Sequence, residues 1–151
     1  MSSREATPEP ILADVVPPSQ TTADGLLSYS CDEIVRLLGI YQEEIACVHP
    51  IVETRDLVHN APQVLEFAKH PDRLSTKSRL IGSKDVHMVK IAIATALIHE
   101  THGKNEVSDK LIHSVELDVG VISLASEVEL KDIQIMGMLV GSSQYSLDLL
   151  N

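Results

Sequence analysis

The sequence is poor in aromatic residues, with no tryptophan, one phenylalanine and three tyrosines among its 151 residues. Hydrophobic residues nevertheless make up 44% of the chain, so its composition is not that of a disordered acidic tail. The length suits one domain with a modest core. That core must be built mainly from leucine, isoleucine, valine, methionine and alanine, as in many helical bundles.

Basic residues are also scarce. The chain has 12 lysines and arginines against 22 aspartates and glutamates, which gives a formal net charge of -10. Positive charge supplies most of the non-specific affinity of proteins for DNA and for anionic membranes. The composition therefore argues against unaided binding of this chain to either surface.

Only two cysteines occur, Cys31 and Cys47. They fall in one predicted helix sixteen residues apart, which at the rise of an α-helix separates them by roughly 24 Å, too far for a disulfide. We expect reduced, partly buried thiols. The first residues, MSSREATPEP, hold no apolar signal core, and no run of about eighteen apolar residues occurs. A soluble intracellular protein without a membrane span is therefore expected.

Five helices are predicted after a flexible leader at residues 1–26, which is rich in Pro, Ser and Thr. Within the leader, ILADVV could dock on the domain as a short extended stretch or remain disordered. The predicted helices cover about residues 31–49, 55–68, 85–103, 106–125 and 127–140. No strand-like alternation of useful length competes with them, so the predicted fold class is all-α.

Local signals place the ends of these helices. Ser30 with Glu33 and Ser126 with Glu129 have the spacing of capping boxes, and Thr54 can cap the second helix. Stops are expected at Pro50 and Gly103, and a short break at Pro62.

Apolar periodicity predicts which faces are buried. The segment from Val86 to Ile98 is apolar on nearly every side and is expected to be central. The stripe of the first helix comprises Ile34, Leu37, Leu38, Tyr41, Ile45 and Val48. That of the fourth comprises Val107, Leu111, Val115, Val119 and Ile122.

Seven histidines raise the question of a metal site. The tightest cluster is His99, Glu100 and His102, in HETH, with the histidines at i and i+3. A zinc protease motif needs histidines at i and i+4 and a third ligand, which this spacing does not provide. We interpret the cluster as a polar helix end and predict no metal or cofactor.

Catalytic chemistry has little support either. Cys47 and His49 resemble a thiolate–imidazole pair, but no third group is placed to orient the histidine. His49 is instead expected to interact favourably with the C-terminus of the first helix. LIGSKD lacks the spacing of a phosphate-binding loop. The adjacent acidic pairs, Asp32–Glu33 and Glu43–Glu44, belong to the solvated face of the first helix. We assign no catalytic residue and expect a non-enzymatic protein.

A basic connection is predicted at residues 69–85. Its cations are Lys69, Arg73, Lys77, Arg79 and Lys84. They could contact a phosphate or a partner, but a solvated loop is the favoured interpretation because no aromatic residue is interleaved for base stacking.

Three segments carry a family resemblance: LLGIYQEEIACVHPIVETRDLVHNA, HMVKIAIATALIHETHGKNEVSDKLIHSV and VELKDIQIMGMLV. Their order and spacing resemble the N-terminal part of the regulatory middle homology region of fungal zinc-cluster transcription factors. The resemblance implies a leader at 1–26, a partial helical regulatory domain at 27–141 and a divergent tail at 142–151. The resemblance also implies that the protein is nuclear. Apart from the resemblance, a cytoplasmic protein is expected.

The chain departs from the family in two ways. Two cysteines cannot form the family's six-cysteine zinc cluster, so direct DNA binding is not expected. The family's later helices have no counterpart in GSSQYSLDLLN. An apolar patch is therefore expected on the third and fifth helices, available to protein partners or to a second copy. The expected function is a regulatory module; the alternatives are a free-standing adaptor, a competing dimerisation module or a non-functional truncated product.

Overall fold

The structure is a computed structural model that describes residues 25–70, 81–122 and 127–150. In these ranges every regular element is helical, which confirms the predicted all-α class. The elements in chain order are α2 (Cys31–Ile40), η1 (Tyr41–Ala46), α3 (Thr54–Lys69), α5 (Ser83–Thr101), α6 (Glu106–Ile122) and α7 (Leu130–Asp148). Most of the predicted leader, including ILADVV, lies outside the described residues. Leu26, at its end, is fully buried.

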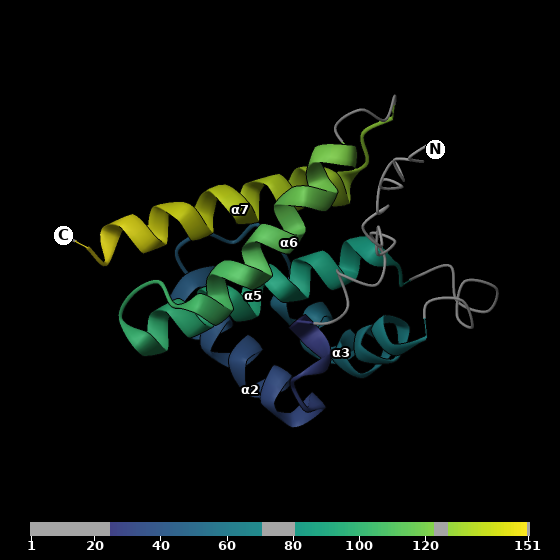
Figure 1. Ribbon diagram of the computed structural model, residues 1–151, viewed down its shortest axis with the longest axis horizontal. Coiled ribbons are helices and arrows are strands. Elements are labelled where there is room, and N and C mark those ends of the chain that lie inside the picture. The colour runs from purple at the N-terminus through teal and green to yellow at the C-terminus, as the bar shows by residue number, and fades with distance from the viewer. Residues whose placement is uncertain (1–24, 71–80, 123–126, 151) are drawn as a thin grey trace, which may run out of the picture.

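α5 is the centre of the molecule. It contacts α2, η1, α3, α6 and α7, and Figure 1 shows it between α7 along one edge and α2 and α3 along the other. Every residue from Asp85 to Ala96 is buried. The central position predicted for this helix is confirmed, because a helix that is apolar on all sides must be covered on all sides. The expectation that it keeps an exposed apolar patch is therefore wrong.

α2 begins where the sequence predicts. The Ser30 hydroxyl accepts a hydrogen bond from the Glu33 backbone N–H at 3.2 Å. The predicted stripe is buried as far as Ile45, but Val48 is 67% exposed. Val48 lies in the turn that follows η1, which ends at Ala46, so it is past the end of the helix and the predicted continuation to Pro50 is wrong.

α3 runs without interruption through Pro62, so the predicted break is wrong. Pro62 is exposed and the flanking Ala61 and Val64 are buried, so packing of the helix on α2 and α5 outweighs the lost hydrogen bond. Thr54 is the first helical residue and is buried, whereas Glu53 occupies the cap position.

α5 ends at the predicted place with a different residue in the left-handed conformation. His102 has φ 55°, and the Gly103 N–H donates to the Ile98 carbonyl at 3.0 Å. This 6→1 bond is characteristic of a Schellman ending. Gly103 therefore follows the residue in the left-handed conformation, which is His102.

The start of α7 also differs from the prediction. Ser126 lies outside the described residues, and the helix begins after Glu129, whose N–H donates to the Asp132 carboxylate at 2.8 Å. The helix then continues to Asp148 and crosses residue 141, where the resemblance implied a domain boundary.

The N-termini of α5 and α7 are joined by reciprocal ion pairs. Lys131 Nζ lies 3.0 Å from both carboxylate oxygens of Asp85. Lys84 Nζ lies 3.0 Å from Asp132 Oδ2. Asp85 also accepts from the Gly82 N–H at 2.9 Å, just as Asp132 caps α7. Each aspartate thus caps its own helix and binds a lysine of the other, which fixes α7 against α5.

Candidate functional site

The largest concentration of exposed apolar side chains lies near the C-terminal end of the described chain. Of eleven large hydrophobic side chains that are exposed in the described residues, seven lie between Val128 and Leu150. Scattered exposed apolar residues are normal on a protein surface, but a contiguous group indicates an interaction site.

α7 carries two apolar seams. The inner seam packs on α5 and includes the buried apolar residues Ile135 and Met138, followed by the buried polar residue Ser142. The outer seam consists of Ile133, Met136, Val140, Ser143, Leu147 and, just beyond the helix, Leu150. Its residues recur at alternating intervals of three and four, the spacing of a coiled-coil seam. All six are exposed.

Two hollows lie along this outer seam and together form the α6–α7 groove. One, of about 240 Å³, is lined by Val119, Glu127, Val128, Asp132, Ile133, Ile135 and Met136. The other, of about 490 Å³, is lined by Glu116, Val119, Gly120, Met136, Leu139, Val140, Ser143, Gln144 and Leu147. Val119 and Met136 line both hollows, so the two adjoin one another along α7.

The α6–α7 groove is acidic at its margins. Glu116, Glu127 and Asp132 line it, of which Asp132 is paired with Lys84 of α5, and neither hollow has a lysine or arginine among its described lining residues. Residues 106–150 contain eight acidic residues, two lysines and no arginine. One of these lysines, Lys131, binds Asp85 on α5. The groove therefore combines an apolar floor with negative margins.

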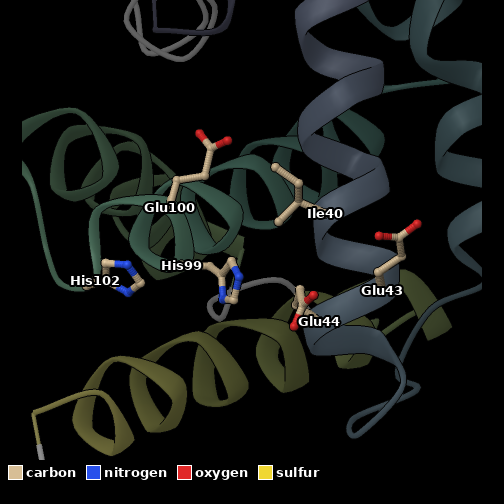
Figure 2. A pocket seen from close by; sticks show the side chains of 6 residues that line it. All are labelled: Ile40, Glu43, Glu44, His99, Glu100 and His102. Atoms are coloured by element: carbon tan, nitrogen blue, oxygen red, sulfur yellow. The ribbon is translucent and has the colours of Figure 1, made fainter.

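A separate polar hollow of about 570 Å³ lies where η1 meets the end of α5 (Figure 2). It is lined by Ile40, Glu43, Glu44, His99, Glu100 and His102. His99 Nδ1 is hydrogen-bonded to the Tyr145 hydroxyl of α7. Burial, and secondarily the Glu44 carboxylate, raises the pKa of Tyr145 above its ordinary value.

Glu100 is engaged by an arginine. The Arg36 guanidinium binds Glu100 and, at 2.6 Å, the Oε1 atom of Glu33. These bonds lower the pKa of both carboxyl groups and raise the pKa of the guanidinium. The ion pairs join α2 to the end of α5, so Glu100 has a structural partner.

The hollow brings together the histidines that the sequence suggested as metal ligands. His99 and His102 both line it, but the first bonds to Tyr145 and the second is the exposed left-handed residue. In the part of the chain that the structure describes, no group of three or more His, Cys, Asp or Glu side chains is placed to hold a metal ion.

The remaining sequence candidates do not converge on a site. Cys47 and His49 are both exposed, so the expectation of a partly buried thiol is wrong at Cys47, whereas Cys31 is half-buried.

Lys84, predicted in a basic loop, lies in the first turn of α5 and pairs with Glu129 and Asp132. Lys69 ends α3 and is exposed. The other cations of that predicted loop, Arg73, Lys77 and Arg79, lie outside the described residues.

A buried polar cluster between α5 and α6 was not predicted from the sequence. Lys90 is fully buried and donates to the Ser114 hydroxyl at 3.1 Å. His87 is 2% exposed, with its Nε2 atom 3.7 Å from Asp118 Oδ2. The signal was present, since a lysine and a histidine interrupt an otherwise apolar central helix, and buried polar groups require partners.

No family model, curated protein or solved structure matches this chain. Among the helices of the described residues, none is long and apolar enough to cross a membrane.

Proposed function

We propose that this protein is a non-enzymatic helical module that acts through protein–protein contacts at the α6–α7 groove. One observation carries the proposal: α7 presents a second apolar seam that nothing in the described residues covers. Leaving such side chains in water forgoes the hydrophobic stabilisation that a partner would supply.

The biological setting that we propose is regulation of transcription in the nucleus. This part of the proposal is supported by the order and spacing of the three sequence segments that resemble the fungal regulatory domain. The acidic composition of the chain agrees with a role that does not require direct contact with DNA.

A reporter assay tests the proposal. The full chain, fused to a heterologous DNA-binding domain, is expected to change transcription from a reporter promoter in fungal cells. Val140→Asp places a charge in the outer seam and should abolish the change. Val48→Asp is the matched control, because Val48 and Val140 are both 67% exposed and Val48 lies away from the groove.

Two results would contradict the proposal. Transcription that is unaffected by the fusion would remove the regulatory role. Equal effects of the two substitutions would show that the outer seam is not the contact surface.

A further inference from the structure

We propose that the α6–α7 groove binds an amphipathic α-helix whose apolar seam is flanked by lysine or arginine. This inference rests on the proposed function, because it specifies the partner of the same groove. It draws on three features of the described residues: the spacing of the outer seam, the shape of the hollows and the charge of the margins.

The spacing indicates that the partner is a helix. Alternating intervals of three and four place Ile133, Met136 and Val140 along one line on α7, and a second helix can lay a seam of the same spacing against that line. α7 has 19 residues, which at the rise of an α-helix extend over about 28 Å. A partner of about five turns would cover it.

The shape of the larger hollow indicates bulky apolar side chains on the partner. Ser143 occupies a seam position where a coiled coil would normally have a large apolar residue, and Gly120 faces the same hollow from α6. Small residues leave space between the two helices. A leucine, methionine or phenylalanine of the partner would fill it.

The charge of the margins selects a basic partner. Glu116 has a side chain that is 56% exposed, and Glu127 is also exposed beside the smaller hollow. Lysines or arginines flanking the partner's seam would lie close to these carboxylates. Complementary charge favours encounter and fixes orientation.

The same charges disfavour a second copy of this chain. A two-fold dimer brings the same patch of both subunits together. Glu116 and Glu127 of one copy would then approach the acidic margin of the other, where like charges repel.

The test uses the full chain and synthetic helical peptides of about three heptads, with leucine at both seam positions. One peptide has lysine at the flanking positions and the other has glutamate. Fluorescence anisotropy should show that the lysine peptide binds more tightly, and that added salt reduces the difference. Val140→Asp should weaken binding about tenfold or more, which corresponds to about 1.4 kcal/mol, whereas Val48→Asp should leave it unchanged.

A matched pair of glutamate substitutions tests the charge argument. Glu116→Lys should weaken binding of the lysine peptide about threefold, within the range of exposed ion pairs. Glu66→Lys is the control: the Glu66 side chain is 57% exposed and lies 4.0 Å from His70, much as Glu116 lies 3.9 Å from His113. Circular dichroism should show that all the variants keep the helical fold.

The outcomes separate this inference from the proposed function. If both peptides bind equally and Val140→Asp weakens both, the basic partner is wrong and the protein-binding groove stands. A dimer by light scattering that Val140→Asp dissociates would identify a second copy as the occupant and overturn the inference alone. Absence of peptide binding together with equal reporter activity of the two valine variants would overturn both.

Discussion

His87 is a titratable side chain held in the interior. Its ring is 2% exposed, and in the described structure its buried Nδ1 atom has no hydrogen-bond partner. Burial lowers the pKa of His87 from its ordinary value of 6.5, and the nearby positive charge of Lys90 lowers it further. The negative charge of Asp118 raises this pKa but does not offset the burial. The folded protein therefore holds this imidazole neutral at pH values where the unfolded chain protonates it.

Stability is expected to fall as the pH is lowered through this range. The unfolded state binds a proton at His87 near pH 6.5 while the folded state resists it, so the contribution is present above that pH and is lost below it. His87→Phe should flatten the profile of unfolding free energy between about pH 7 and pH 5, measured by urea denaturation. His113→Phe, at an exposed histidine, is the control. An unchanged slope in His87→Phe would contradict the assignment.

The elements are held in register by the ion pairs between the starts of α5 and α7. Asp85 is buried, caps α5 and binds Lys131. Asp85→Ala should lower the free energy of unfolding by about 1–2 kcal/mol, since it removes the cap of α5 and the ion pair with Lys131. Lys131→Ala alone should cost less than about 1 kcal/mol.

A double-mutant cycle between Asp85 and Lys131 checks the coupling by denaturation. Their coupling energy should exceed that of Glu106 and Lys110, an i,i+4 pair on α6 whose side chains are 81% and 74% exposed. Exposed helical pairs contribute about 0.3–0.5 kcal/mol. Equal coupling in the two cycles would show that the ion pair does not hold α7 against α5.

The sequence predicted the positions of the helices well and the residues at which they begin and end less well. The Ser30 cap and the central segment 86–98 follow from local rules, and both are observed. The π-helical turn after Ile40 and the continuous helix through Pro62 were not predicted. In the latter case packing against neighbouring helices overrides local propensity, and a single sequence does not contain that information.

The candidate groove was predicted only in outline. An apolar excess on the last helix indicated that some apolar surface would remain open, and Val140 and Met136 are indeed exposed. Hydrophobic periodicity indicates which faces of a helix are apolar, but it does not identify which neighbouring helix covers each face. The segment 85–103 was therefore expected to share the exposed patch, whereas five elements cover it.

The arrangement around α5 predicts how the whole molecule unfolds. Because every other named element of the described chain contacts α5, a cavity in this helix should weaken all of the packing at once. Ile91 is fully buried, and Ile91→Ala should lower the free energy of unfolding by about 2–5 kcal/mol. Ile133→Ala makes the same chemical change at a side chain that is 61% exposed and should alter the free energy of unfolding by no more than about 0.5 kcal/mol.

Circular dichroism and Tyr fluorescence during urea denaturation should give coincident transitions in both variants, with only the midpoint of the Ile91→Ala variant displaced. Similar losses at the two positions would mean that the outer seam of α7 is already covered in solution, and separate transitions would mean that α5 does not unite the fold.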